Sequence, residues 1–408
     1  MERAIALAAR KPEMHNKFLL VRWLSGWLFA VALLIAGQPS LAQPDVNAPG
    51  PAIPLATAEQ RGPVDAYIRA RRAYEQEAET YWQLVAEKRR VRFAKRRHQE
   101  PIELGDYVMT QPPVYSGPPR PLGYVPPRRD PAEPPLPIPV VADFLRAAAK
   151  QFRFVPDRPN SEVEFKRAYA KAATTAGLTK DQAVRIYAFE TGGNGTYDVQ
   201  AGLTSRRKDA RAISAAIGYN QLLSTNTVGL LAEHGDKFVK TLREPLTRLA
   251  ENQRNAMEQK IAALRRMIAF SRTVPNAWKE HDKLAKTTPG GMGIHAAVLD
   301  RDIGPLLQTQ KLLDSVLFAR MKGYTRPLTA AELELMNFTG DGNGIDMVLM
   351  PQDLRERVPT ANFFQRNGYE RNPIARRTGT VAALVAAIET KMDYASQAQG
   401  AKELAEAF

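Results

Sequence analysis

Proline is concentrated in residues 101–139, and this concentration limits what the chain can fold into more than any other feature of its sequence. Proline has no backbone N–H and a nearly fixed φ, so it is poorly tolerated inside helices and at the centre of sheets. The tract contains four proline pairs: Pro112-Pro113, Pro118-Pro119, Pro126-Pro127 and Pro134-Pro135. Such a segment favours an extended polyproline conformation. We therefore expect residues 100–139 to form a proline-rich segment, either a free linker or a strap whose aromatic residues dock on a folded domain.

The N-terminus has the pattern of an export signal. Basic residues precede an apolar run from Leu24 to Ala36, and Ser40-Leu41-Ala42 offers the small residues that signal peptidase requires. The run is short for a membrane span, and an uncleaved anchor is the alternative. We expect a signal peptide over residues 1–42, an unstructured Pro- and Ala-rich segment over 43–62, and a location in the periplasm or cell envelope.

A basic helix is predicted over residues 63–99. Aromatic and apolar residues recur there at helical spacing: Tyr67, Tyr74, Tyr81 and Val85. Its end is rich in lysine and arginine, and the whole chain has a formal net charge of +14. This end is either a solvated helix face or an arm that binds an anionic envelope surface through residues 88–97. Export argues against nucleic acid as the partner of this charge.

From residue 140 onward the apolar residues follow helical periodicity, and no convincing run of alternating strand residues occurs. A helix over 161–176 should be capped by Gly177, and Thr179 with Gln182 fits a capping box that begins a helix running to Glu190. Other expected elements are helices at 206–216 and 221–234, a charged helix at 244–272 within a helical insertion near 241–286, and loops over 337–378. The predicted fold class is mainly α, with one domain over residues 140–408.

Glu190 has the best setting for acid catalysis. It lies at the predicted C-terminal end of a helix, where the helix dipole disfavours a negative charge, and Tyr187 and Phe189 would desolvate it. Both effects raise the pKa of a carboxyl, as a general acid at neutral pH requires. The glycine-rich loop at 191–195 would let backbone approach a bulky substrate. The alternative is a glutamate that merely precedes a glycine stop.

Two short motifs resemble those of the soluble lytic transglycosylase and goose-type lysozyme families. Glu190-Thr191-Gly192 is similar to their first motif and Gly218-Tyr219-Asn220-Gln221 to their second. The usual patterns are Glu-Ser and Gly-Leu-Met-Gln, with a shorter gap between them. The resemblance implies a lysozyme-like helical fold that cleaves the MurNAc-GlcNAc bond of peptidoglycan with Glu190 as the catalytic residue. It also implies substrate-binding residues: Thr191, Gly218, Tyr219, Asn220 and Gln221. Their third motif, an aromatic-Asn pair, has two candidates, Asn337-Phe338 and residues 363–369.

The resemblance leaves three functions open. In a transglycosylase the C6 hydroxyl of the substrate attacks the anomeric carbon, so one carboxylate suffices. A lysozyme-type muramidase would usually need a second carboxylate, for which Asp198 and Asp209 lie in the right part of the chain. The third possibility is a non-catalytic envelope protein that uses the same fold to bind the wall. Of the two enzymes, the transglycosylase requires fewer groups beyond Glu190.

Other chemistries find little support in the sequence. The chain has no cysteine, which excludes thiol nucleophiles and thiolate metal sites, and its five histidines lack zinc-site spacing. Residues 339–346 match a calcium loop only in part, because an acid is missing at both ends, so a tight turn is expected there. We expect no metal and no cofactor. The aromatic and amide residues of 359–373 suit either a sugar-binding surface or a packed loop.

Overall fold

The computed structural model describes residues 58–125, 137–203 and 211–408, so the predicted signal peptide and residues 43–57 lie outside the described part of the chain. Within those ranges the protein is mainly helical and contains no β-strand, only isolated bridges. The predicted fold class is therefore confirmed. None of the helices in this part of the chain combines the length and the apolar composition that a membrane crossing requires.

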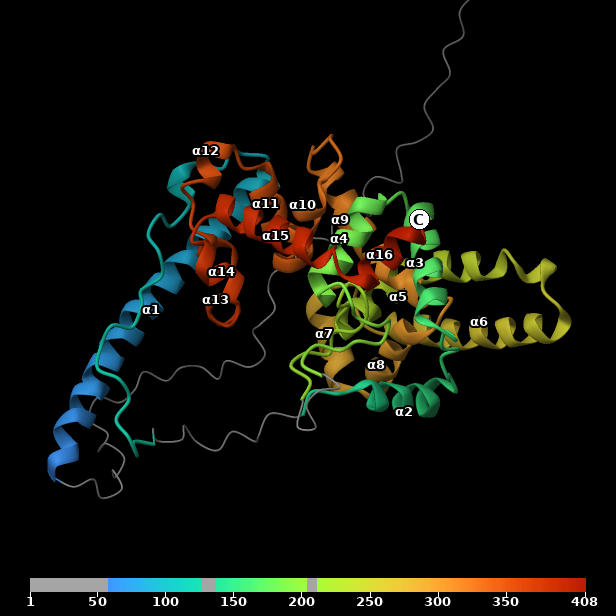
Figure 1. Cartoon of the computed structure of the whole chain (residues 1–408), viewed down its shortest axis with the longest axis horizontal. Coiled ribbons are helices and arrows are strands. Elements are labelled where there is room, and N and C mark those ends of the chain that lie inside the picture. Colours follow the sequence, from blue (N-terminus) through green and yellow to red (C-terminus); the bar gives the residue numbers. More distant parts are fainter. Residues whose placement is uncertain (1–57, 126–136, 204–210) are drawn as a thin grey trace, which may run out of the picture.

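Helices make up most of the described chain (Figure 1). Their bounds are α1 Ala58–His98, α2 Val141–Phe152, α3 Glu162–Ala176, α4 Lys180–Thr191, α5 Ser224–Arg243, α6 Glu251–Ser271, α7 Trp278–Thr287, α8 Pro289–Ile294, α9 Gly304–Met321, α10 Ala330–Thr339, α11 Asp341–Leu349, α12 Gln352–Arg355, α13 Arg366–Arg371, α14 Pro373–Thr378, α15 Val381–Ala395 and α16 Gln399–Glu406. Short 3-10 helices are η1 Leu104–Asp106, η2 Leu246–Arg248, η3 His295–Leu299 and η4 Thr360–Phe363.

Buried apolar side chains form two clusters. One gathers residues of α3, α4, α10, α11, α15 and α16 together with the second half of α1. The other gathers residues of α2, α5, α6, α8 and η3. Helix α9 belongs to both, because Leu307 lies in the second cluster and Leu312 in the first. Glu190 follows Phe189, a residue of the first cluster, so the candidate site belongs to that half of the molecule.

Local capping signals fix both ends of α4. Thr179 accepts a hydrogen bond from the backbone N–H of Gln182 at 3.1 Å, and the Gln182 side chain accepts one from the Thr179 backbone N–H at 2.9 Å. The predicted capping box is thus present. Gly177 caps α3 at φ +83° and Gly192 caps α4 at φ +69°, both in the left-handed region that favours glycine. Glu190 is consequently held in the last turn of a helix with two defined ends.

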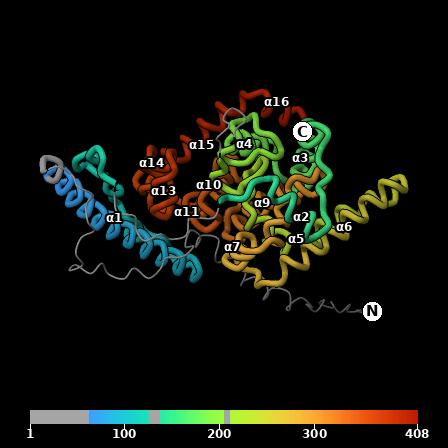
Figure 2. Tube along the Cα trace, turned by 90° about the horizontal axis from the view of Figure 1, so that it is seen from below, coloured from blue at the N-terminus to red at the C-terminus, as the bar shows by residue number. Residues whose placement is uncertain are grey.

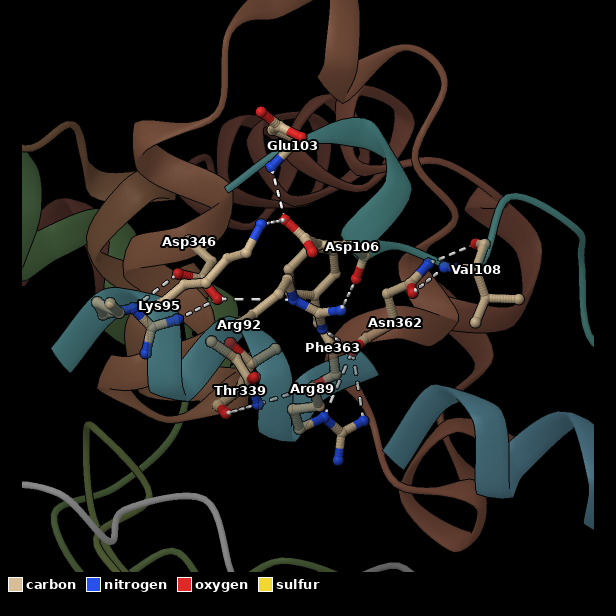
Figure 3. Close-up of polar contacts among 12 residues, drawn as sticks. Arg89, Arg92, Lys95, Glu103, Asp106, Val108, Thr339, Asp346, Asn362 and Phe363 are labelled. Carbon is tan, nitrogen blue, oxygen red and sulfur yellow. Dashed lines mark hydrogen bonds and ion pairs between the residues drawn. The ribbon is translucent and has the colours of Figure 1, made fainter. Parts of the chain in front are cut away.

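Helix α1 is tied to the rest of the protein by its basic C-terminal half (Figure 3). Arg92 is fully buried and donates to the carbonyl oxygens of Asp106 at 2.9 Å and Asn362 at 2.8 Å. Arg96 donates to Asp346 at 2.8 Å, and Lys95 pairs with Asp106 at 2.7 Å. Arg89 is also buried, and it donates to the carbonyl oxygens of Asn362 and Phe364.

Four cations of residues 88–97 therefore have partners inside the protein, and binding of an anionic surface by this segment stays a prediction that rests on the other basic residues. Arg89 and Arg92 lie inside the protein, and Lys95 and Arg96 are paired with internal carboxylates. The physical reason is that backbone carbonyls and buried acids of the domain offer these cations better partners than solvent does. Arg90 and Arg97 remain exposed.

The described part of the proline-rich segment is docked rather than free. Tyr107 and Val108 are buried, and the backbone of Val108 exchanges two 2.8 Å hydrogen bonds with the side chain of Asn362. Farther on, Tyr115 packs edge-on against Tyr67 and Tyr74 of α1. Residues 104–125, called the strap below, thus run back along α1 (Figure 1). Residues 58–62, expected to be unstructured, belong to α1.

Helices α5 and α6 form a hairpin that projects from the end of the molecule away from α1 (Figure 2). The helical insertion predicted near 241–286 covers the end of α5 together with η2, α6 and most of α7. The charged helix expected over 244–272 begins only at Glu251, because Pro245 precedes the short turn η2 at the hairpin tip. The helix expected over 206–216 is wrong for residues 211–216, which are irregular; residues 204–210 lie outside the described part.

Residues 337–378 are largely helical, which corrects the expected loops. Helices α11 to α14 occupy this region. Its glycines separate and pack helices rather than form a turn: Gly340, at φ +80°, divides α10 from α11. A Cβ atom on Gly344 would lie 2.4 Å from the Cα atom of Met336, so α11 packs on α10 with no room for a side chain there. Asp346, within the tentative calcium pattern, pairs with Arg96 instead.

Candidate active site

Glu190 is brought together with residues of α10 and α15. Asn337 of α10 donates its side-chain amide to Glu190 Oε1 at 2.9 Å. Lys391 of α15 lies with its ammonium 3.7 Å from the centre of the Phe189 ring, and its charge acts on Glu190. Glu190 itself is half-buried. Of the two expected candidates for a third motif, Asn337-Phe338 is thus the pair beside Glu190.

Glu334 is the residue of this site that the sequence did not reveal. It lies one helical turn before Asn337, is fully buried, and its carboxyl is within hydrogen-bonding reach of the Glu190 carboxyl. Neither of its carboxyl oxygens has a donor at hydrogen-bond geometry. Two carboxyl groups in contact, one of them without a donor, make a pair whose ionisation states depend on each other.

Burial dominates the acid-base properties of the pair. It raises the pKa of Glu190 from 4.5 to about 7, against the opposing effects of hydrogen bonding with Glu334, the charge of Lys391 and the amide of Asn337. Burial and the neighbouring Glu190 raise the pKa of Glu334 well above its ordinary value. Near neutral pH the Glu190 carboxyl can therefore exist both with and without its proton, which is the property of a general acid that also acts as a base.

The loop after Glu190 is packed against the C-terminal helices. The Asn194 side chain accepts a hydrogen bond from the Gly400 backbone N–H at 2.9 Å. A Cβ atom on Gly193 would lie 2.1 Å from the carbonyl oxygen of Ala395. Gly193 and Gly195 are buried, whereas Gly192 is exposed. The glycines at 193 and 195 therefore serve close packing within the protein, and the expected approach to substrate is restricted to Gly192.

Tyr219 and Asn220 lie in the core, which corrects their prediction as substrate-binding residues. The Tyr219 ring packs 4.6 Å from that of Tyr187, and its hydroxyl donates to Glu162. Asn220 accepts a hydrogen bond from Tyr169 at 3.0 Å. Tyr219 is 0% and Asn220 2% exposed, so neither side chain can reach a glycan on the surface. Their contacts instead hold the turn at 218–221 against α4, through the packing of Tyr219 on Tyr187.

The other residues of the second motif shape that turn. Gly218 has φ +83°, and an added Cβ atom would lie 1.9 Å from Nε2 of Gln308, so a larger residue would require both a strained backbone and a shift of the Gln308 side chain. Gln221 is half-buried, and its amide donates to the carbonyl oxygens of Gly218 at 2.9 Å and Val199 at 3.2 Å. The turn is thereby tied to the chain that follows Glu190. The Glu190 carboxyl itself is hydrogen-bonded to Asn337 of α10.

Thr191 keeps its hydroxyl within α4. It donates to the carbonyl oxygen of Tyr187 at 2.7 Å, and the residue is half-buried. This bond occupies the hydroxyl hydrogen, so a substrate group would meet Thr191 Oγ1 only as an acceptor. Thr191 thus remains adjacent to the carboxyl without a contact that assigns it a binding role.

The aromatic segment at 359–373, which includes η4 and α13, is packed against the protein rather than open as a sugar-binding surface. Asn362 and Phe363 are buried against the strap, and Phe364 and Tyr369 are at most 7% exposed. Among the described ranges, no group of three or more acidic, histidine or cysteine residues could hold a metal ion. A pocket of about 600 Å³ lies between α4, α15 and α16. Its lining includes Lys180 and Asp393 but not Glu190, so it is separate from the candidate site.

Comparison with models of protein families, with curated proteins and with solved structures finds no match to this chain.

Proposed function

We propose that the protein is an exported lytic transglycosylase with a lysozyme-like fold that cleaves the MurNAc-GlcNAc bond of peptidoglycan. Glu190 first protonates the glycosidic oxygen, and its carboxylate then removes the proton from the C6 hydroxyl that attacks the anomeric carbon. The observation that carries the proposal is the site of Glu190. A half-buried carboxyl, whose pKa burial raises to about 7, accepts an amide hydrogen bond from Asn337 in the last turn of α4.

The second carboxyl favours a transglycosylase over a two-carboxylate hydrolase. Hydrolases of that kind place the sugar between their carboxyl groups, about 5 Å apart in retaining enzymes and about 6.5–9.5 Å apart in inverting ones. Glu334 is in contact with Glu190 and is fully buried, so no sugar fits between them. Of the earlier candidates for a second acid, Asp198 pairs with Arg158, and Asp209 lies outside the described part of the chain. Among the described acids considered for this role, Glu190 is the one that is neither fully buried nor paired with an arginine.

Mass spectrometry of the soluble products from purified peptidoglycan tests the proposal. The wild-type chain should release fragments with anhydro-muramyl ends, and Glu190→Gln should release at least about 100-fold less, because general acid catalysis contributes about that much or more. Glu389→Gln, at an exposed carboxyl of α15, is the matched control and should keep wild-type activity. Reducing ends in place of anhydro ends would identify a muramidase.

Two other results would overturn the assignment. Unchanged release by Glu190→Gln would exclude this residue as the acid. A wild-type protein that sediments with peptidoglycan but releases no fragments over a broad pH range would be a wall-binding protein without this activity.

A further inference from the structure

The carboxyl of Glu334 has no role in the chemistry described above, yet it is the most isolated acid of the site. It is 0% exposed, and both of its oxygens lack a hydrogen-bond donor. An ionised carboxylate in such a position would lose its hydration without any compensating bond, at a cost of several kcal/mol. A protonated carboxyl carries no charge and has a donor of its own. The surroundings of Glu334 therefore favour its protonated form.

The neighbouring Glu190 is the acceptor that a protonated Glu334 can reach. Asn337 also lowers the pKa of Glu334, but its amide meets hydrogen-bond geometry at Glu190, at 2.9 Å, and Glu190 keeps some exposed surface. When the pair holds only one proton, the negative charge is consequently more stable on Glu190 and the proton on Glu334. The asymmetry follows from the hydrogen-bond partners and the burial of the two side chains.

We propose that Glu334 is a positioning residue whose carboxyl stays protonated at neutral pH and donates a hydrogen bond to the carboxylate of Glu190. This inference rests on the proposed function for its catalytic consequence, but the shared proton itself does not depend on any activity. The first ionisation of the pair takes a proton from Glu190. The hydrogen bond from Glu334 stabilises the resulting carboxylate and thereby offsets part of the effect of burial, so that Glu190 can act as a base after it has acted as an acid.

The charges that act on this pair of carboxyls come from α10 and α15. The elements packed on α4 are α3, α10, α15 and α16. Helix α10 supplies Glu334, and α15 supplies Lys391, whose charge acts on both carboxyls. Lys166 of α3 and Glu403 of α16 pair with each other at 2.6 Å. Glu334 is thus the charged group in direct contact with Glu190, whereas Lys391 lowers the pKa of both carboxyls through its charge.

The direct test is a pH titration by carboxyl ¹³C NMR of the full chain labelled at glutamate, with the Glu190 signal assigned through Glu190→Gln. Glu334→Gln keeps a neutral donor of nearly the same shape, so the Glu190 midpoint should stay within about half a pH unit of the wild type. Glu334→Met removes the donor and should raise the midpoint by about one to two units, the value of one hydrogen bond to a charged group. Glu332→Gln is the matched control, a buried glutamate of the same helix whose substitution retains its capping box, and it should leave the midpoint unchanged.

Three results would overturn the inference. A Glu190 midpoint that falls in Glu334→Gln would mean that Glu334 is ionised in the wild type and repels Glu190. An unchanged midpoint in Glu334→Met would mean that no hydrogen bond joins the two groups. A Glu332→Gln protein whose midpoint moves as far as that of Glu334→Met would mean that any substitution in α10 disturbs the site. If Glu334→Met does not fold, Glu334→Gln decides alone. An unchanged Glu190 midpoint in that variant supports the inference, and a lower midpoint excludes it.

The pH profile of glycan release separates this inference from the proposed function. If the protein cleaves peptidoglycan, Glu334→Met should shift the limb that reports the Glu190 base to higher pH by the same one to two units, and Glu334→Gln should retain the wild-type profile. A wild-type protein without activity would refute the proposed function, while the NMR titration would still decide whether Glu334 donates to Glu190.

Discussion

Replacing Glu190 by glutamine should stabilise the protein at pH 8 but not at pH 4.5. The pKa of this carboxyl is raised from 4.5 to about 7 by burial, so the folded chain holds its proton more tightly than the unfolded chain. Below pH 4.5 the carboxyl is protonated in both states, so its ionisation contributes nothing to the free energy of unfolding. Between pH 4.5 and 7 the unfolded chain ionises first, which favours unfolding, and the loss is complete above pH 7.

The difference between the two pKa values corresponds to at most about 3 kcal/mol of unfolding free energy, because Glu190 keeps some exposed surface and solvent screens part of the effect. Glutamine does not ionise and so escapes this loss. Removal of the Glu190 charge also lowers the raised pKa of Glu334, and this change stabilises the folded protein at pH 8 as well.

Urea unfolding followed by far-UV circular dichroism at pH 4.5 and pH 8 measures the effect, since the described chain is mainly helical. The stability gain of Glu190→Gln over the wild type should be about 1–3 kcal/mol larger at pH 8. Glu389→Gln, at an exposed position, should show no such difference. An equal effect of Glu190→Gln at both pH values would refute the claim that the carboxyl is buried with a raised pKa.

The remaining predictions concern the supports of the site. Arg92→Met should cost about 3–5 kcal/mol of unfolding free energy, because Arg92 is fully buried with two hydrogen bonds to backbone carbonyls, whereas the exposed Arg90→Met should cost under about 0.5 kcal/mol. Hydrogen exchange at Val108 should accelerate in the first variant alone; similar exchange in both would contradict the role of Arg92 in holding the strap. Gly218→Ala should cost at least about 2 kcal/mol in urea unfolding, from the positive φ and the collision with Gln308 together. Gly177→Ala has the same φ of +83° but open space around its Cβ position, so it should cost only about 1 kcal/mol, and equal losses would show that the collision is relieved without cost.

Local signals in the sequence were sufficient to place Glu190 on its helix. Thr179 with Gln182 and the glycine at 177 act within a few residues of their own positions, so their pattern carries the structural information directly. The residues that α4 meets were not predictable in this way. Glu334 stands in an apolar run, Leu333-Glu334-Leu335-Met336, where a single acid gives no indication of its partner. A turn-by-turn reading of α10 would have offered one clue, since Glu334 and Asn337 share a helix face.

Long-range partners also explain why the inward-facing cations of the N-terminal arm were not predicted. A run of arginines and lysines has the same sequence pattern whether it faces solvent or donates to carbonyl oxygens 270 residues away, as Arg92 does to Asn362. The glycines at 340 and 344 have the composition of a turn, yet Gly344 permits two helices to touch. In both cases the determining group lies in a different element, and composition of the segment alone cannot identify it.

The arm and the candidate site belong to one packed structure, through a continuous series of aromatic contacts. Trp82 of α1 packs against Tyr369 at 5.5 Å, Tyr369 against Phe364 at 6.2 Å, Phe364 against Phe338 at 5.7 Å, and Phe338 against Phe189 at 6.3 Å. Phe338 follows the amide that binds Glu190, and Phe189 precedes Glu190 itself. Because close-packed interiors transmit displacement, the position of α10 relative to α4 depends on the docking of α1 as well as on the two helices. The contact between α4 and α10 that defines the site is therefore supported from the N-terminal arm, a part of the chain that the motifs at 190–192 and 218–221 do not include.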